Sequence, residues 1–314
     1  MRITAAICTR DRPDFAVHAV ESVLDNTHSN FELIVVDQSR SDRTGQLLET
    51  QFGHDARLRY IRTASGGVSP ARNLALAAAS GEAVAFTDDD CVVRSDWLET
   101  VDRIFTREPD ADMLYGQVLM PPELADVEGE VPTLSMDAER RIRRGESFGL
   151  RGMTANCAVR RRLFAQIAGF DEALGPGRPL HSGEDFDLNY RAYQAGALIL
   201  LTPEMVVDHY GIRAPADWQS RLAEYGFGDA AFYLKHVRCG DIHLTRVMLN
   251  HLTRQSLRAL LLRPGAAIYL RGFARGAGAS LRFLVSRRTR LYAGTWNSSP
   301  ESADEPGCVV TMRG

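Results

Sequence analysis

Short apolar runs alternate with amphipathic segments through the first half of this 314-residue chain. Four runs rich in branched apolar residues predict buried strands at residues 3–8, 31–37, 58–61 and 83–87. Helical spacing of apolar residues in the segments between them predicts helices at residues 15–24, 44–52 and 70–79. Strands that alternate with helices and are apolar along their length indicate a mostly parallel sheet with helices on both faces. We therefore predict an α/β fold.

The pattern changes in the second half of the chain. Residues 121–149 are polar, with prolines and clustered arginines, which predicts a mobile connection beside the functional site. Further elements are predicted at residues 156–159 (strand), 161–168 (helix), 184–196 (helix) and 198–201 (strand). The segment 206–210 then closes a first domain, 1–212.

Helical patterns dominate the C-terminal third. They cover residues 218–237, 244–262 and 266–286, so that 213–295 is predicted to be a helical appendage. Residues 296–314 are rich in Ser, Glu, Pro and Gly, which predicts a disordered tail.

The charges of the chain are unevenly distributed. The formal net charge is -3, yet residues 245–292 hold ten arginines and no acidic residue, so the remainder carries -13, which is -3 minus 10. Basic amphipathic helices bind anionic membrane surfaces. A packed appendage or a homodimer interface with a solvated basic face explains the pattern equally well, and both interpretations stay open. Nucleic-acid binding is not predicted, because no recognised binding module accompanies the arginines.

The cysteines and apolar segments predict a location. Five widely spaced cysteines without a C-x-x-C pair are typical of reduced thiols, and we expect Cys91, Cys157 and also Trp97 to be packing residues. No stretch of 18 uncharged apolar residues occurs, and the N-terminus lacks the apolar core of a signal peptide. We predict a cytoplasmic protein that does not span a membrane, with peripheral contact to the inner face of the membrane left open.

Three consecutive carboxylates follow the fourth predicted strand. Asp88, Asp89 and Asp90 stand at its carboxyl end, and Asp37 ends the second strand. Ligands of such sheets bind outside the carboxyl ends of the strands. Clustered carboxylates repel one another unless a cation lies among them, and oxygen ligands suit Mg²⁺ or Mn²⁺ bridging phosphates. From the triplet alone, a solvated acidic turn is an equally good interpretation.

Five motifs occur in a fixed order within residues 3–210. They are Cys8-Thr9-Arg10-Asp11-Arg12-Pro13, Val35-Val36-Asp37-Gln38-Ser39, Ser69-Pro70-Ala71-Arg72-Asn73, Asp88-Asp89-Asp90 and Gly183-Glu184-Asp185-Phe186-Asp187. Each is unspecific alone. In this order they resemble the family 2 glycosyltransferases of the GT-A fold. The resemblance implies transfer of a sugar from a nucleotide diphosphate to a hydroxyl acceptor with inversion, by a nucleotide-binding half, 1–120, and an acceptor-side half, 150–212.

The resemblance also implies which residues bind the donor. Thr9 and Arg10 would bind the nucleotide, Asp37 would accept a hydrogen bond from its base, and Asp88 would face its ribose. Arg72 would add positive charge near the nucleotide. A helix-surface arginine is the alternative interpretation of Arg72.

The remaining acids and a histidine are assigned to the metal and to proton transfer. By the same resemblance, Asp90 and His209 would hold Mn²⁺ or Mg²⁺, which neutralises the leaving diphosphate, and Asp89 would tune the local field. Inverting transfer needs a base for the acceptor hydroxyl. We predict Asp185, with Glu184 holding the acceptor or replacing it as base. The alternatives are a structural histidine and two acids that merely favour a helix N-terminus.

Two other function classes compete with this prediction. A nucleotidyltransferase also uses carboxylates and Mg²⁺, but it should have a glycine-rich loop after the first strand, and residues 9–13 contain no glycine. A non-catalytic module that binds sugar nucleotides or glycans is disfavoured by Asp88, Asp90 and Asp185. The sequence leaves open whether the donor contains UDP, GDP or dTDP. It also leaves open whether the hydroxyl acceptor is a glycan, a lipid-linked sugar or a small molecule.

Overall fold

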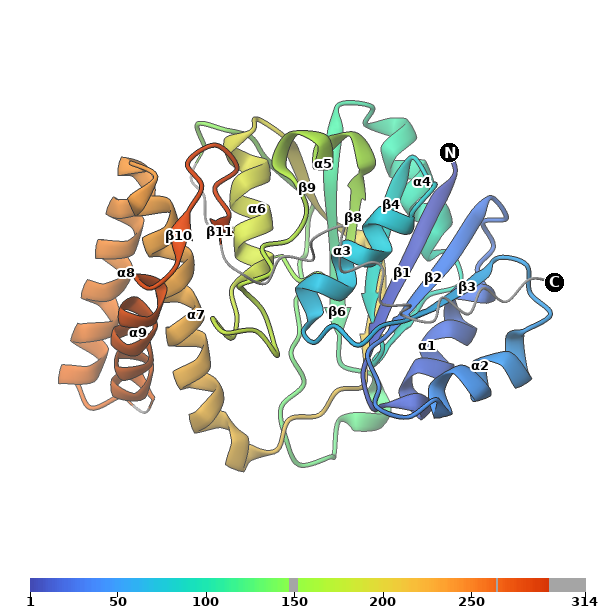
Figure 1. Cartoon of the computed structure of the whole chain (residues 1–314), viewed down its shortest axis with the longest axis horizontal. Coiled ribbons are helices and arrows are strands. Elements are labelled where there is room, and N and C mark those ends of the chain that lie inside the picture. The colour runs from blue at the N-terminus through green and yellow to red at the C-terminus, as the bar shows by residue number, and fades with distance from the viewer. Residues whose placement is uncertain (147–151, 264, 294–314) are drawn as a thin grey trace.

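The computed structural model of the chain describes residues 1–146, 152–263 and 265–293. Its centre is a nine-stranded sheet with helices on both faces, and three long helices stand together at one side (Figure 1). The predicted α/β fold with a C-terminal helical region is confirmed. The predicted tail, 296–314, lies outside the described residues, as do residues 150 and 151 of the predicted acceptor-side half.

The first half of the chain forms a parallel sheet with connecting helices. Its strands are β1 Ile3–Thr9, β2 Phe31–Asp37, β3 Leu58–Arg62 and β4 Ala83–Asp88. They pair in parallel in the order β3-β2-β1-β4. The connecting helices are α1 Pro13–Leu24, α2 Arg43–Phe52 and α3 Val68–Ala78. Every predicted end in this half lies within two residues of the observed one.

The three elements directly after the acidic triplet were not predicted from the sequence. They are β5 Cys91–Val93, α4 Trp97–Arg107 and β6 Ala111–Leu119. The packing role expected for Trp97 is confirmed, because its side chain is fully buried and its indole N–H donates to Asn156 Oδ1 at 2.9 Å.

The second half of the chain completes the sheet. Strand β8 Asn156–Arg160 runs antiparallel between β4 and β6, and the helices α5 Arg161–Ile167 and α6 Glu184–Gln194 follow it. The predicted strand 198–201 and segment 206–210 form one strand, β9 Leu198–His209, so the prediction of two pieces was wrong. Its pairing with β6 continues past Thr202-Pro203-Glu204 because the register shifts between Tyr115 and Gln117. Strand β9 also pairs with β5 and with the short β7 Arg140–Ile142, which lies in the polar connection.

The sheet separates two apolar layers. Alternate residues of β1 face opposite sides, as the two-residue period of a strand requires. Ile3, Ala5 and Ile7 pack in the layer under α1 and α4, whereas Ala6 packs in the layer under α3, α5 and α6. The second layer continues into the C-terminal helices, so these share one core with the sheet.

The C-terminal region consists of the helices α7 Trp218–Arg238, α8 Ile242–Leu260 and α9 Ala266–Ser280, followed by a hairpin of β10 Leu284–Val285 and β11 Tyr292–Ala293. The predicted helix 266–286 therefore ends early, because the chain turns into this hairpin. Glycines allow α7 and α9 to pack closely. A Cβ on Gly226 would lie 2.2 Å from the Tyr269 carbonyl oxygen. Among the residues that the structure describes, no helix has the length and apolarity needed to cross a bilayer.

Candidate active site

The carboxyl ends of neighbouring parallel strands bring several predicted residues to one edge of the sheet. In the ladder Thr9 is in register with Asp37, and Cys8 with Asp88. Thr9, Asp37 and Asp88 therefore lie along the edge at which ligands of α/β sheets bind. This placement agrees with the sequence prediction.

Arg72 joins two of the acidic motifs. It lies in α3 and is 5% exposed. Its guanidinium donates to Asp88 Oδ1 at 3.0 Å and to Asp185 Oδ1 at 3.2 Å, and it lies 3.6 Å from Glu184 Oε1. Burial disfavours its charge, but Asp185, Asp88 and Glu184 outweigh burial and raise the pKa of Arg72. The interpretation as a helix-surface arginine is therefore wrong.

The acids Glu184 and Asp185 begin α6. The preceding Gly183 has a φ of 94°, a left-handed conformation that glycine adopts without strain. Asp185 accepts hydrogen bonds from the Thr154 hydroxyl and, at 3.2 Å, from the Thr154 amide. Burial and the charge of Asp185 raise the pKa of Glu184 to about 8, although Arg72 opposes the rise. Glu184 therefore holds a proton near neutral pH.

Asp90 and His209 approach each other from different parts of the chain. The pairing of β5 with β9 places Cys91 opposite His209, and Asp90 Oδ1 lies 3.3 Å from His209 Nε2. The ligand atoms of Asp90, Cys91 and His209 lie within 4.8 Å of one another. A Cβ on Gly211 would lie 2.5 Å from Asp90 Oδ2 and 3.1 Å from His209 Nε2, so glycine leaves this space free.

The chemistry of this group fits a divalent cation. A carboxylate and an imidazole suit Mn²⁺ and, less well, Mg²⁺. Burial raises the pKa of Cys91 well above its usual value, so Cys91 remains a thiol and is a poor ligand for such an ion. The structure thus brings together Asp90 and His209, the two metal ligands that the resemblance implies.

Arg12 is a site residue that the sequence interpretation missed. Its Nη1 donates to Asp90 Oδ2 at 2.8 Å and its Nε to Asp89 Oδ2 at 3.1 Å. Burial opposes the ionisation of Asp90, but His209 and Arg12 outweigh it and lower the pKa of Asp90 to about 2. The available signal was the position of Arg12 in the loop directly after a strand whose end lies at the site.

Asp89 connects that loop to the end of β4. Its side chain is 1% exposed, and its Oδ2 accepts a hydrogen bond of 2.7 Å from the Thr9 hydroxyl. Together with the Arg12 contacts, this bond fixes the loop against the acidic triplet. Burial raises the pKa of Asp89 to about 7, although Arg12 opposes the rise.

Asp37 and Arg10 lie at different depths. Asp37 is fully buried, and its two oxygens accept from the Ser39 amide and from the Tyr60 hydroxyl, each at 2.7 Å. Arg10 is exposed and pairs with its neighbour Asp11 at 3.9 Å. The structure therefore places Asp37 inside the wall of the site and Arg10 on its rim.

The chain is similar to several known glycosyltransferases. The pre-mycofactocin glycosyltransferase of Mycobacterium tuberculosis is 31% identical over 184 residues, which cover 55% of this chain and 36% of that protein. Glycosyltransferase GlyG of Streptococcus pneumoniae is 31% identical over 103 residues, or 32% of this chain and 34% of that protein. The chain thus spans about a third of the length of these curated relatives.

Two solved structures support the predicted GT-A-like fold. The mannosyltransferase PcManGT from Pyrobaculum calidifontis, in complex with GDP-Man and Mn²⁺, superposes with a TM-score of 0.57 at 16% identity, covering 89% of this chain and 86% of that one. S. aureus TarS 1-349, in complex with UDP-GlcNAc, superposes with a TM-score of 0.56 at 17% identity, covering 95% of this chain and 98% of that one.

The sequence model of a known family gives the most direct assignment. Residues 4–167, more than half of the chain, match glycosyl transferase family 2. The matched segment includes the ends of β1, β2 and β4, and with them Arg12, Asp37 and the acidic triplet. From this match and from the agreement in fold, we conclude that the chain belongs to glycosyl transferase family 2.

Proposed function

We propose that this chain is a metal-dependent inverting glycosyltransferase that transfers a sugar from a nucleotide diphosphate to a hydroxyl acceptor. The observation that carries the proposal is the buried Arg72, which contacts both Asp88 at the end of β4 and Asp185 at the start of α6. Inversion needs a leaving group and a base on opposite sides of the anomeric carbon. Asp88, beside the proposed donor site, and Asp185, the proposed base, come from two separate elements, which suits that requirement.

Asp90 and His209 are the proposed metal ligands. Their 3.3 Å separation and the space beside Gly211 support this assignment, and the structural neighbour PcManGT was solved with GDP-Man and Mn²⁺. A bound divalent cation would neutralise charge on the diphosphate that leaves. Arg12 contributes further positive charge beside Asp89 and Asp90.

Asp185 is the proposed general base. A base must have a free carboxylate at the working pH, and with a pKa of about 8 Glu184 holds a proton near neutral pH. The hydrogen bonds from Thr154 and Arg72 orient Asp185. In the proposed step, Asp185 accepts the proton of the acceptor hydroxyl while the hydroxyl oxygen bonds to the anomeric carbon and the nucleotide diphosphate departs.

The nucleotide is proposed to lie at the ends of β1 and β2. Asp37 would accept a hydrogen bond from the base, which requires its fully buried carboxylate to become accessible by release of the Tyr60 contact. Thr9 and Arg10 would line the same edge, and Asp88 would face the ribose. Structural neighbours solved with UDP-GlcNAc and GDP-Man support a donor of this class.

The basic helices are proposed to dock on an anionic membrane surface. Ile242, Leu249 and Leu260 of α8 are 69%, 55% and 78% exposed, and at about 100° per residue they lie within roughly 20° of one another around the helix. Arg246 and Arg254 are exposed on the same helix. Around the helix, Arg246 lies about 40–60° from these apolar residues and Arg254 about 120–140°, so only Arg246 adjoins them. Exposed apolar side chains with an adjoining arginine suit shallow burial among anionic headgroups, and a homodimer through residues 245–292 is the competing proposal.

A donor screen tests the proposed reaction. The full-length protein is incubated with UDP-glucose, UDP-GlcNAc, GDP-mannose or dTDP-glucose and Mn²⁺, and nucleotide release is measured with water as the acceptor. We expect slow release of the nucleoside diphosphate from one donor and its loss on chelation with EDTA. Release of pyrophosphate would indicate a nucleotidyltransferase instead. Binding of a donor that is never cleaved, with or without added acceptor sugars, would favour a non-catalytic module.

A further inference from the structure

We infer that Lys235 and Asp187 are positioning residues that fasten the first turn of α6 to the C-terminal helices and thereby hold Asp185 in place. The inference rests on the proposed function, because it concerns the orientation of the proposed base. It makes the helical region after residue 212 a part of the active-site architecture, which no sequence motif suggested.

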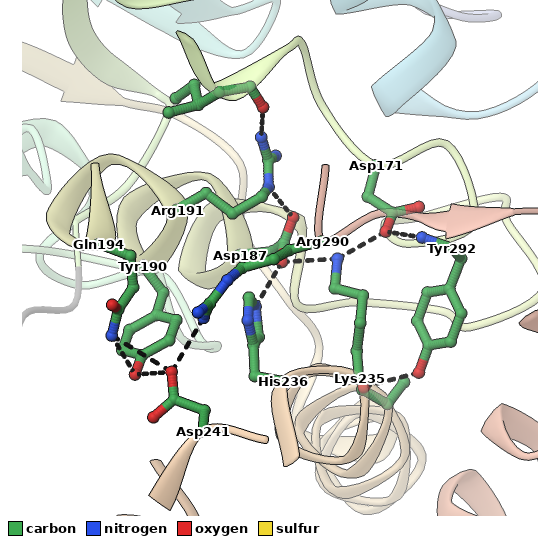
Figure 2. Close-up of polar contacts among 12 residues, drawn as sticks. Asp171, Asp187, Tyr190, Arg191, Gln194, Lys235, His236, Asp241, Arg290 and Tyr292 are labelled. Atoms are coloured by element: carbon green, nitrogen blue, oxygen red, sulfur yellow. Dashed lines mark hydrogen bonds and ion pairs between the residues drawn. The ribbon is translucent and has the colours of Figure 1, made fainter. Parts of the chain in front are cut away.

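Asp187 is the centre of the contact. It is fully buried, two residues after Asp185 and on another face of α6. Its Oδ1 lies 2.6 Å from Lys235 Nζ and 2.9 Å from His236 Nε2, both on α7, and its Oδ2 accepts from Arg191 Nε at 2.8 Å (Figure 2). One carboxylate therefore joins α6 to α7 of the C-terminal region.

Lys235 extends the contact to a third segment. Its fully buried ammonium also lies 2.5 Å from Asp171 Oδ2, in the loop after α5. The same oxygen accepts a 2.8 Å hydrogen bond from the Tyr292 amide in β11 (Figure 2). A buried ammonium is tolerated only with close opposite charges, so Lys235 fixes α6, α7 and the Asp171 loop relative to one another.

The charges of the cluster are balanced. Two carboxylates, Asp171 and Asp187, face two cations, Lys235 and Arg191, while burial lowers the pKa of His236 to about 4 and keeps it neutral. Arg191 also donates to the Gly169 carbonyl oxygen at 2.8 Å. The contacts thus hold α6 from both the α5 side and the α7 side.

A second contact lies further along the same helix. Tyr190 donates to Asp241 Oδ2 at 2.7 Å, Gln194 donates to the same oxygen at 3.2 Å, and Arg290 donates to it at 2.9 Å (Figure 2). Residues 187, 190 and 194 follow helical spacing, so they share one face of α6. That face is fastened to the C-terminal region, whereas Glu184 and Asp185 turn toward Arg72.

The contacts between α6 and the C-terminal region matter because a base needs a precise position. A base is effective only when it is held close to its reacting position, and a displacement of about 1 Å can reduce turnover by about 10²-fold. Asp187 lies two residues after Asp185 in the same helical turn, so its hydrogen bonds also restrain Asp185. We therefore expect their loss to affect turnover more than donor binding.

The test uses a double variant that keeps the buried charges balanced. Lys235→Met with Asp171→Asn removes the bridge and leaves Asp187 paired with Arg191. Tyr269→Phe is the control, because it removes a buried hydroxyl that contacts Asp229 of α7 and His251 of α8, away from α6. Hydrogen exchange of backbone amides, UDP or GDP affinity with Mn²⁺, and donor hydrolysis are measured on the full chain.

We expect the double variant to exchange faster at residues 185–188 than the wild type, with the strands β1 to β4 unchanged. Nucleotide affinity should be retained, and hydrolysis should fall on the order of 10-fold or more. The Tyr269→Phe control should show faster exchange only in the C-terminal helices, with hydrolysis unchanged. Unaltered exchange at 185–188, or equal effects of both variants on hydrolysis, would overturn the inference. A wild type that hydrolyses no donor would refute the proposed function alone, since the exchange measurement still decides the positioning.

Discussion

At the scale of single residues, two adjacent acids have different environments. Asp185 is ion-paired with Arg72 and hydrogen-bonded to Thr154, whereas burial and the Asp185 charge raise the pKa of Glu184 to about 8. The sequence alone offered both acids as bases. In the proposed mechanism Asp185 accepts the proton, and burial leaves Glu184 as a neutral neighbour near pH 7.

Amide substitutions distinguish these two roles. Asp185→Asn should retain nucleotide binding yet lower turnover by about 10² or more, the scale of losing a positioned base. Glu184→Gln should change turnover much less, because an amide resembles the protonated acid that is already present. Steady-state hydrolysis of the donor found by screening, together with nucleotide affinity, measures both effects. Comparable losses from the two substitutions would contradict the assignment of the base.

His236 gives the stability of the protein a specific pH dependence. Burial lowers its pKa to about 4 in the folded protein, from about 6.5 in the unfolded chain. Between these values only the unfolded state gains the proton, so the free energy of unfolding falls as pH falls from 6.5 to 4, by roughly 3 kcal/mol at most. Above pH 6.5 the histidine contributes no dependence.

Urea unfolding at pH 7 and at pH 4.5 measures this effect. The His236→Gln variant keeps a donor for Asp187 but does not titrate, so it should lose less stability between the two pH values than the wild type. Other titrating groups affect both proteins alike and cancel in the comparison. An equal loss in the two proteins would show that His236 is not the group responsible.

At the scale of elements, glycines set the distance between α7 and α9. A Cβ on Gly272 would lie 2.1 Å from the Ala223 carbonyl oxygen, whereas a Cβ on Gly278 of the same helix would meet nothing within 4 Å. Gly272→Ala should therefore separate the helices and lower the free energy of unfolding by about 1–3 kcal/mol. Gly278→Ala should be neutral or stabilising by up to about 1 kcal/mol.

Thermal unfolding of the two alanine variants decides the point. Both variants replace glycine by alanine in α9, so the change in helix propensity is the same. They differ only in the space available for the added Cβ. Destabilisation of the same size in both would mean that the close approach of α7 and α9 does not limit position 272.

The first half of the fold was predictable because each strand and helix has its own local periodicity. The elements β1 to β4 follow from continuous apolar runs. The strand β6 was missed because its antiparallel and parallel neighbours come from residues 156–160 and 198–208, so tertiary pairing stabilises it. Tertiary pairing also explains β9. The polar residues 202–204 predict a break in the strand, but β9 continues across them because its pairing with β6 shifts in register.

The candidate site was predictable where motifs end strands and not where distant segments meet. Asp88, Asp90 and Asp185 were predicted from motif order and His209 from the family resemblance, and the structure places them in two clusters around Arg72 and Asp90. The Thr154 contact with Asp185 depends on how β8 enters the sheet, which no local pattern encodes. The Lys235 contact with Asp187 likewise links residues with unrelated sequence patterns.

At the scale of the whole molecule, the C-terminal region has two surfaces. Its inner side is fastened to α6 through Asp187 and Asp241, and its outer side presents the apolar residues of α8 among arginines. Because Arg290 and Tyr292 belong to the inner contacts, removing the chain after residue 239 would disturb α6 as well. Substitutions on the outer surface therefore test membrane docking better than this truncation does.

Liposome sedimentation tests the outer surface. The wild type should pellet with phosphatidylglycerol vesicles at low salt and less at high salt, because headgroup attraction is screened. The variant Ile242→Ser with Leu249→Ser and Leu260→Ser should pellet much less, whereas Met120→Ser with Val127→Ser, at exposed positions outside the C-terminal region, should match the wild type. Absence of binding at low salt, or equal binding to neutral vesicles, would favour the dimer, which light scattering detects.

The most direct measurement is calorimetric titration of UDP, GDP and dTDP with and without Mn²⁺. We predict that one nucleotide binds the wild type and the control Asp126→Ala in a metal-dependent manner. Asp90→Ala should lose the metal-dependent part, at least about tenfold in affinity, or about 1.4 kcal/mol, and should keep its fold by circular dichroism. If Asp90→Ala retained full metal-dependent affinity, or if no nucleotide bound the wild type, the proposed metal-dependent donor site would be contradicted.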